Sequence, residues 1–165
     1  DILYIGISDC DPQNAYFHKR YKDNGSNDVY RSLKEPAIYT FTFFERARMI
    51  TEAMALEGVD RSEFTVVPFP VHFPHLLKYY VPQEAVIYIT VYDEWGEGKP
   101  SLFGSLGYET DLLWRRTMDE RFTTATEVRR RMAKGEDYSE LIPKGVLKVI
   151  KEYDLEKKLK NCDNI

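Results

Sequence analysis

Short apolar runs alternate with amphipathic stretches along most of the chain. Runs rich in β-branched and aromatic residues predict strands at residues 2–7, 64–70, 85–92 and 108–114. The run at residues 85–92 is apolar almost throughout, which is typical of a strand covered on both faces. Because helical patterns separate the strands, the sequence predicts a Rossmann-like α/β fold, a doubly wound parallel sheet with helices on both faces.

The best-defined helix is expected at residues 42–57. Thr42 can cap its first turn, and Glu45 completes a capping box with it. Apolar side chains then recur at helical spacing until Gly58, a residue type that favours the left-handed conformation after a helix. Shorter helices are expected at residues 76–80 and 99–106.

The last third of the chain is predicted to be a helical segment. Thr124 and Glu127 repeat the spacing of a capping box, and Gly135 ends the helix that they begin. One helical turn is expected at residues 138–141. Pro143 then favours the first position of a helix that continues to about residue 153.

Length and composition place the chain among ordinary globular proteins. With 165 residues, of which 43% are hydrophobic and 30% charged, it is expected to form one domain around one core. That domain would comprise an α/β core over about residues 1–120 and a helical part over about residues 121–160. Polar and aromatic residues 13–37 predict an exposed loop, and its segment 16–30 is a candidate lid.

Charge and cysteine content narrow the class of function. A formal net charge of −4 argues against nucleic acid as a partner, because non-specific binding to it needs a basic face. Cys10 and Cys162 form no Cys-x-x-Cys motif, so neither a disulfide framework nor a zinc site is supported, and a cytoplasmic location is expected. No apolar run reaches the roughly 18 residues of a membrane span, so no membrane partner is expected.

One helix start combines the features of an anion site. Thr124 and Thr126 place hydroxyl groups where backbone N–H groups and the positive end of the helix dipole point outward. Arg129 follows within one turn, and a guanidinium group binds phosphate through charge-assisted hydrogen bonds. The alternative is a capped surface helix whose arginines are merely solvated.

The same residues resemble the Ser/Thr-x-Thr-x-x-Arg signature of the His-x-Gly-His nucleotidyltransferases. Further blocks are similar to the nicotinamide-mononucleotide adenylyltransferase branch of that family: Phe-Thr-x-x-Glu-Arg-x-x-Met-Ile at residues 41–50, Pro-x-Pro at residues 68–70 and an arginine-rich ending from residue 129. The blocks keep the family's order from residue 2 to about residue 153. The resemblance implies the family's fold, ATP and a small phosphorylated acceptor as ligands, and Mg²⁺ as the cofactor.

The resemblance also implies roles for individual residues. Thr124, Thr126 and Arg129 would hold the β- and γ-phosphates of the nucleotide, with Thr124 and Arg129 taking part in catalysis. Arg46 would face the phosphate of the acceptor, and Phe41 is a further candidate for acceptor binding. The alternative for Arg46 is a contact within its own helix or with the helix cap.

Other candidate ligand contacts lie at the ends of predicted strands. Gly6, Ile7 and Ser8 end the first strand, where the backbone can approach a nucleotide closely. Asp93 follows the run at residues 85–92 and is assigned to hydroxyl groups of the nucleotide or acceptor, and Trp95 is assigned to stacking on a base or ring. The alternatives are a turn former at Asp93 and a core aromatic at Trp95.

The family's defining His-x-Gly-His motif does not occur in these 165 residues. The three histidines are His18, His72 and His75; the last two have the wrong spacing and follow a later strand, so we interpret them as loop or pocket residues. The resemblance implies either that a strand-helix unit with the motif precedes Asp1 or that the chain is a degenerate relative that binds nucleotide without turnover.

The acceptor region departs from the family pattern as well. Tyr39-Thr40 replaces the usual Asn-Pro, and the Asn-x-x-Trp that often lines the nicotinamide pocket is not evident around residues 72–77. Nicotinamide or nicotinate mononucleotide is the expected acceptor, with a phosphonate or sugar phosphate as the alternative. Asp9 and Asp11 are candidate Mg²⁺ contacts, although acidic residues are common in turns.

The sequence thus predicts an enzyme, a nucleotidyltransferase that transfers AMP from ATP to the acceptor, releases pyrophosphate and belongs to NAD biosynthesis. The alternatives are a cytidylyltransferase acting on another phosphorylated acceptor and a noncatalytic nucleotide-binding module. Proteins of this family are often multimeric, so a homo-oligomer is a candidate state, but no surface stripe in the sequence specifies an interface.

Overall fold

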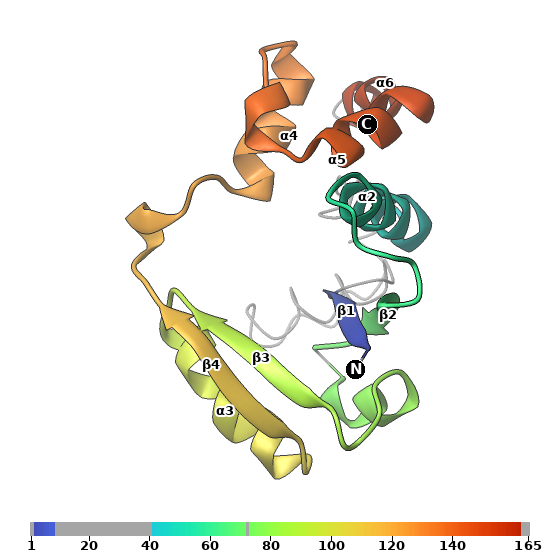
Figure 1. Ribbon diagram of the computed structural model, residues 1–165. Helices are drawn as coiled ribbons and strands as arrows, with labels where there is room; N and C mark the ends of the chain where they lie inside the picture. Colours follow the sequence, from blue (N-terminus) through green and yellow to red (C-terminus); the bar gives the residue numbers. More distant parts are fainter. Residues whose placement is uncertain (1, 9–40, 72, 163–165) are drawn as a thin grey trace, which may run out of the picture. The chain divides into compact units, whose positions relative to one another are not determined.

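The computed structural model describes residues 2–8, 41–71 and 73–162 (Figure 1). The chain divides into two compact units: Asp1–His72 with Ala125–Ile165, and Phe73–Thr124. The expected arrangement as one domain stays a prediction. Among the described residues, no helix has both the length and the apolar character needed to cross a membrane.

The first unit contains a parallel pair of strands, β1 (Leu3–Ser8) and β2 (Phe64–Phe69). Gly6 of β1 pairs with Val67, and Ser8 pairs with Phe69. A Cβ atom on Gly6 would lie 2.6 Å from Cδ2 of Phe69, so the glycine leaves room for that aromatic ring. Both strands occur where the apolar runs predicted them.

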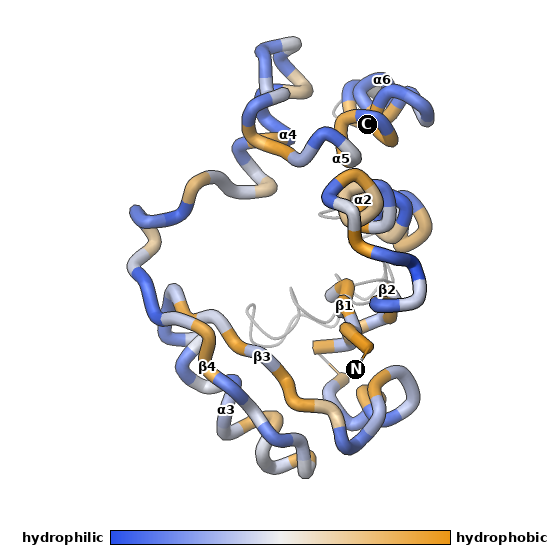
Figure 2. Tube along the Cα trace, viewed as in Figure 1, coloured by the Kyte–Doolittle hydropathy of each residue, from blue (hydrophilic) through white to orange (hydrophobic). Residues whose placement is uncertain are grey.

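The described part of the first unit also contains the helices α2 (Phe43–Leu56), α4 (Ala125–Lys134), α5 (Lys144–Glu152) and α6 (Leu155–Cys162). A 3₁₀ turn, η4 (Ser139–Leu141), precedes α5. Figure 2 shows how apolar segments of these helices alternate with hydrophilic ones. The apolar core of the unit consists of Met49, Met132, Tyr138, Val149, Ile150, Leu155 and Leu159.

Gly145 of α5 lies directly against the backbone of α2. A Cβ atom at this position would overlap the backbone of Glu52 and Ala53 in α2. Only glycine therefore allows α5 to pack this closely against α2, the helix that carries Arg46.

The second unit contains another parallel pair, β3 (Val86–Val91) and β4 (Glu109–Arg115), joined through α3 (Glu94–Ser105). Two 3₁₀ turns, η2 (Pro74–Tyr79) and η3 (Met118–Glu120), flank this β-α-β segment. The register of the strands shifts between Ile89 and Thr90. The buried apolar side chains of the second unit are Leu77, Val81, Ile87, Ile89, Val91, Phe103 and Tyr108.

The fold class is confirmed as α/β with parallel strands that are connected through helices, as in a Rossmann-like protein. One expectation about β3 is not met within its unit. Ile87 and Ile89 are buried, but Val86 and Tyr88 on the other face are 37% and 56% exposed. Successive side chains of a strand point to opposite faces, so Ile87 and Ile89 lie on one face and Val86 and Tyr88 on the other. The second unit therefore covers only one face of β3.

Helices α3 and α6 differ from the prediction. Helix α3 begins at Glu94 rather than at Lys99, because the carboxylate of Asp93 accepts a hydrogen bond from the backbone N–H of Gly96 at 2.8 Å and caps the helix. Two glycines and Pro100 hid this helix in the sequence, since both residue types are poor helix formers. Helix α6 was not predicted.

Candidate active site

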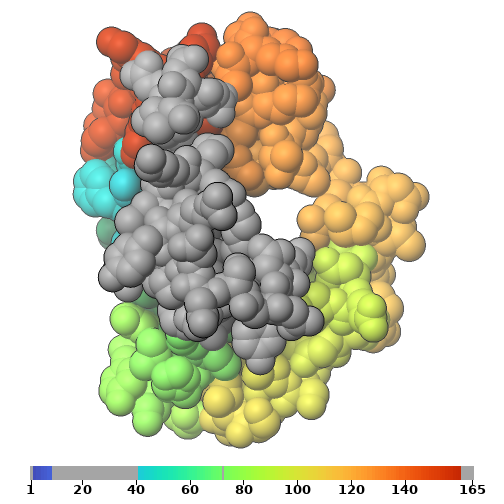
Figure 3. All heavy atoms as spheres, turned by 180° about the vertical axis from the view of Figure 1, so that it is seen from behind, coloured from blue at the N-terminus to red at the C-terminus, as the bar shows by residue number. Residues whose placement is uncertain are grey.

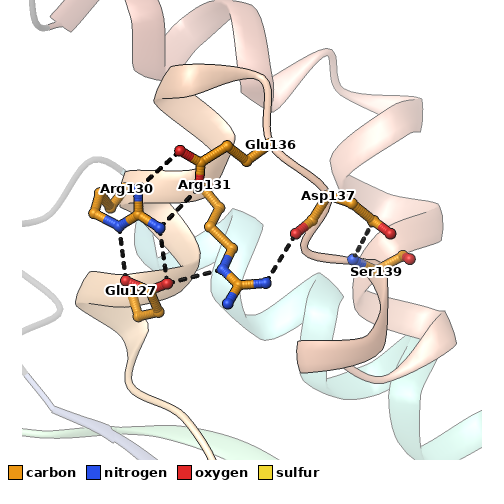
Figure 4. Close-up of polar contacts among 6 residues, drawn as sticks. All are labelled: Glu127, Arg130, Arg131, Glu136, Asp137 and Ser139. Atoms are coloured by element: carbon orange, nitrogen blue, oxygen red, sulfur yellow. Dashed lines mark hydrogen bonds and ion pairs between the residues drawn. The ribbon is translucent and has the colours of Figure 1, made fainter.

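Three consecutive arginines on α4 differ in what they contact. Arg129 is half-buried, and among the described residues its side chain has no hydrogen bond, ion pair or ring contact. Arg130 and Arg131 are both paired with acidic residues of the same segment (Figure 4). A guanidinium group that is partly removed from water without a counter-charge is poorly solvated. Arg129 is thus the member of the triplet whose side chain has no counter-charge among the described residues.

A carboxylate network holds the other two arginines. Arg130 donates two hydrogen bonds to Glu127, at 2.8 and 2.9 Å, and two to Glu136, at 3.0 and 2.8 Å. Arg131 donates to Glu127 at 2.8 Å and to the carbonyl oxygen of Asp137 at 3.1 Å. Hydrogen bonds from Arg130 and Arg131 lower the pKa of Glu127 to about 2. Arg130 and Arg131 are therefore paired with carboxylates of their own segment, and the choice between a phosphate site and a capped surface helix depends on Arg129.

The turn after α4 brings Glu136 back toward Arg130. Gly135 has a φ of 69°, a left-handed conformation that favours glycine. Its N–H donates to the carbonyl of Met132 at 3.2 Å, and the N–H of Glu136 donates to the carbonyl of Arg131 at 2.9 Å. These two bonds form a Schellman motif, and they confirm that the helix ends at Gly135.

The predicted phosphate-binding threonines lie at the start of α4. Thr124 directly precedes the helix, and Thr126 is an exposed residue of its first turn. Residues three apart on a helix face the same side, so Thr126 and Arg129 are neighbours on one face of α4. Figure 3 shows α4 (orange) at the surface on one face of the molecule.

Arg46 connects α2 to the end of β1. Its Nη1 donates a hydrogen bond to the backbone carbonyl of Ser8 at 2.9 Å. Ser8 is the last residue of β1, and ligands of parallel α/β sheets bind at this end of the strands. The structure thus brings together two of the residues that the sequence assigned to different ligands.

The start of α2 fixes the position of Arg46. Thr42 and Glu45 form the predicted capping box, with hydrogen bonds of 3.2 Å and 2.7 Å. Both carboxylate oxygens of Glu45 also accept from Nζ of Lys158 in α6, at 2.7 Å. Burial raises the pKa of Glu45, but the hydrogen bonds from Lys158 and Thr42 outweigh it and hold the pKa below its usual value. The alternative of a cap contact applies to Glu45, whereas Arg46 reaches β1.

Three other candidates of the first unit have structural roles. Gly6 makes room for Phe69, as described above. The side chain of Ile7 is only 5% exposed and belongs to the buried residues. Phe41 packs partly buried against the core of the helices. Ligand contacts of these residues stay predictions.

Asp93 and Trp95 belong to the second unit. The carboxylate of Asp93 caps α3. Asp93 thus has a structural role, as the turn-former alternative expected, but as a helix cap. Trp95 lies in the first turn of α3 and is 56% exposed, so it is not a core aromatic. Nζ of Lys99, one turn further on, lies 4.3 Å from the centre of the Trp95 ring. Burial lowers the pKa of Lys99, and Asp93 partly opposes this shift.

Further cation and aromatic groups near the end of β3 were missed by the sequence reasoning. Cζ of Arg121 lies 4.3 Å from the centre of the Tyr92 ring. The indole N–H of Trp114 donates to the Tyr92 hydroxyl at 3.1 Å. No local pattern in the sequence indicated these contacts, because the partners lie 22 or more residues from Tyr92 along the chain.

The remaining histidine and metal candidates add little. His75 lies in η2 and makes an edge contact with the ring of Phe73. His18, His72, Asp9 and Asp11, like the candidate lid at residues 16–30, lie outside the described residues. Within the described part of the chain, no group of three or more His, Cys, Asp or Glu residues could hold a metal ion.

Comparisons with known proteins decide the family. No family model matches the chain. Phosphonoformate cytidylyltransferase of Streptomyces viridochromogenes is 34% identical over 158 residues, which cover 96% of this chain and 80% of the relative. The chain belongs to the nucleotidyltransferases. As a member of this family, it is an enzyme of the class that transfers nucleotidyl groups.

Other relatives of this nucleotidyltransferase carry a different name. Nicotinamide-nucleotide adenylyltransferase of Pyrococcus horikoshii is 30% identical over 138 residues, 83% of this chain and 70% of the relative. The same enzyme of Thermococcus sibiricus is 32% identical over 132 residues, and the match spans 66% of its length. These relatives confirm the resemblance stated from the sequence, and they leave two nucleotides and two acceptors as candidates.

Proposed function

We propose that this nucleotidyltransferase binds the triphosphate of a nucleotide at the start of α4 and transfers the nucleotidyl group to a phosphate or phosphonate group of a small acceptor. The half-buried Arg129 carries the proposal, because it has no partner among the described residues while Arg130 and Arg131 are both paired. A triphosphate would supply the missing counter-charge. The backbone N–H groups at the helix start and the hydroxyls of Thr124 and Thr126 would add hydrogen bonds to the same phosphates.

In the proposed reaction, an oxygen of the acceptor attacks the α-phosphorus of the nucleotide. A new P–O bond forms, the bond from the α-phosphorus to the bridging oxygen breaks, and pyrophosphate leaves with the bonding electrons. Little covalent chemistry is required of the protein, so the rate comes from alignment and from positive charge near the leaving group. Arg129 supplies such a charge.

Mg²⁺ is proposed to arrive with the nucleotide. This cation is commonly bound through substrate phosphates and one or two carboxylates rather than by a complete protein cage. The residues at the start of α4 fit that mode, since they offer cationic and hydroxyl groups for phosphate. Mg²⁺ would neutralise charge on the phosphates, whereas the side chains of the chain orient them.

Arg46 is proposed to bind the anionic group of the acceptor. Its hydrogen bond to Ser8 places the guanidinium at the carboxyl end of β1, where an acceptor can approach. Gly6 to Ser8 would then contact nucleotide or acceptor through their backbone. Asp93, Trp95 and Phe41 remain proposed contacts for the sugar hydroxyls and rings of the ligands.

CTP and a small phosphonate or phosphorylated acid are the substrates that we favour. The cytidylyltransferase relative matches 96% of this chain, whereas the two adenylyltransferases match 83% and 78% of it. The missing Asn-x-x-Trp around residues 72–77 also argues against a nicotinamide pocket. ATP with nicotinamide mononucleotide, the reading that the sequence favoured, is the second candidate, supported by identities of 30% and 32%.

Pyrophosphate release by the full gene-encoded protein tests both candidates. CTP and ATP are each combined with phosphonoformate and with nicotinamide mononucleotide, in the presence of Mg²⁺. The proposal expects the highest kcat/KM for CTP with phosphonoformate. A higher kcat/KM for ATP with nicotinamide mononucleotide would favour the second candidate, and the absence of pyrophosphate in all four reactions would contradict both.

A further inference from the structure

Glu127 and Glu136 distinguish between the three adjacent arginines of α4, because they form hydrogen bonds with Arg130 and Arg131 but none with Arg129. The three side chains start within one turn of the helix, and each is long and flexible enough to reach a neighbouring anion. Yet Arg130 makes four hydrogen bonds to two carboxylates, and Arg129 makes none to described residues. The two carboxylates therefore hold Arg130 and leave the Arg129 side chain without a carboxylate partner among the described residues.

Helix geometry shows which arginine would compete for the same ligand. Successive residues are about 100° apart around a helix axis, so Arg130 lies about 40° from Thr126, and Glu127 lies about 160° from Arg129. Arg130 thus flanks the face that carries Thr126 and Arg129. Glu127 lies on the far side of Arg130 and draws its guanidinium away from that face.

Glu136 holds the same guanidinium from the other end of the helix. The Schellman turn at Gly135 directs Glu136 back toward Arg130, and the two side chains share two hydrogen bonds of 3.0 and 2.8 Å. Both carboxylates are partly exposed, with 36% and 45% of their side chains accessible to solvent. Exposed ion pairs contribute little to the free energy of folding, so stability alone is a weak reason for this network.

From this geometry we infer that Glu127 and Glu136 are positioning residues that keep Arg130 off the polyphosphate, so that Arg129 alone of the three arginines binds it. The inference rests on the proposed function. A second guanidinium would bind the pyrophosphate product as well as the nucleotide. Tighter binding of the product slows its release, and product release sets kcat in many enzymes.

The test compares pyrophosphate binding and turnover in the full gene-encoded protein and its variants. Calorimetry with pyrophosphate and Mg²⁺ gives Kd, and steady-state kinetics give kcat. The double variant Glu127→Gln with Glu136→Gln releases Arg130, and we expect pyrophosphate to bind at least about tenfold more tightly, as for one added hydrogen bond between charged groups, with a similar fall in kcat. Adding Arg130→Gln to this variant is expected to restore both values.

Two controls separate release of Arg130 from a simple loss of negative charge. Glu136→Gln alone should tighten pyrophosphate binding by a smaller factor, whereas Glu140→Gln makes the same charge change nearby and should have no effect, since Glu140 contacts no arginine among the described residues. If the double variant does not fold, this pair still provides the comparison. An unchanged Kd in the folded double variant, a tightening that persists after Arg130→Gln, or equal effects of Glu136→Gln and Glu140→Gln would overturn the inference.

Arg129→Gln distinguishes failure of this inference from failure of the proposed function. If Arg129→Gln leaves pyrophosphate binding intact, the site at α4 is not the polyphosphate site, and both ideas fail. If Arg129→Gln weakens binding but release of Arg130 changes neither Kd nor kcat, only the positioning role of Glu127 and Glu136 is lost.

Discussion

Replacing Gly145 with alanine is expected to separate α5 from α2. The added methyl group would overlap the backbone of Glu52 and Ala53, and backbone atoms cannot rotate away as a side chain can. Overpacking of this kind costs about 1 to 3 kcal/mol, and we take the upper end because the overlap is with backbone. Alanine recovers about 1 kcal/mol through its higher helix propensity. The net loss in the free energy of unfolding is then about 2 kcal/mol.

Urea unfolding followed by far-UV circular dichroism measures this loss directly. In a thermal scan the same loss corresponds to about 4 to 8 °C in Tm for a protein of this size. Gly98→Ala is the matched control, because this exposed glycine lies within α3 and a Cβ atom there would meet nothing within 4 Å. It should be neutral or stabilising by up to about 1 kcal/mol. Equal stability of the two variants would refute the argument that Gly145 sets the distance between α2 and α5.

Three further predictions follow from single contacts. Lys158→Met should cost about 1 to 2 kcal/mol, because it leaves the carboxylate of Glu45 without a charged partner. Since the pKa of Glu45 is lowered in the folded state, its contribution is present above pH 4.5 and is lost as the pH falls further; acid titration of stability should show a smaller decrease in this variant. Gly135→Ala should destabilise by about 1 to 2 kcal/mol in urea unfolding, and Gly135→Asn by less, because φ is 69°. Trp95→Ala should change stability by under about 0.5 kcal/mol but weaken nucleotide binding in calorimetry.

Local signals in the sequence predicted most of the secondary structure. The Thr42 and Glu45 capping box, Gly135 after α4 and all four apolar strands were found at or within a residue or two of their places. These features depend on residues that are close in sequence, where pattern and conformation are directly coupled. Helix α3 was placed too late, because its glycines and its proline outweighed the cap at Asp93.

Contacts between distant segments were beyond the sequence pattern. Nothing local in the chain indicated that Arg46 would reach Ser8, 38 residues earlier, or that Lys158 would bind Glu45. The sequence also did not indicate that Arg130 and Arg131 would be paired while Arg129 would not, because the pairing depends partly on the turn that brings Glu136 back to the helix. Resemblance to a family pointed to Arg129 all the same, and its contact with phosphate stays a prediction.

Binding of CTP with Mg²⁺ to the full gene-encoded protein and to Arg129→Gln tests the central claim most directly. Arg131→Gln is the control, because it removes the same charge from the same helix but from a guanidinium that is already paired. Loss of hydrogen bonds to a charged phosphate costs about 1.5 to 3 kcal/mol, so Arg129→Gln should raise Kd by about 10- to 150-fold, and Arg131→Gln by less than about threefold. Equal Kd values for the two variants would contradict the placement of the triphosphate at α4.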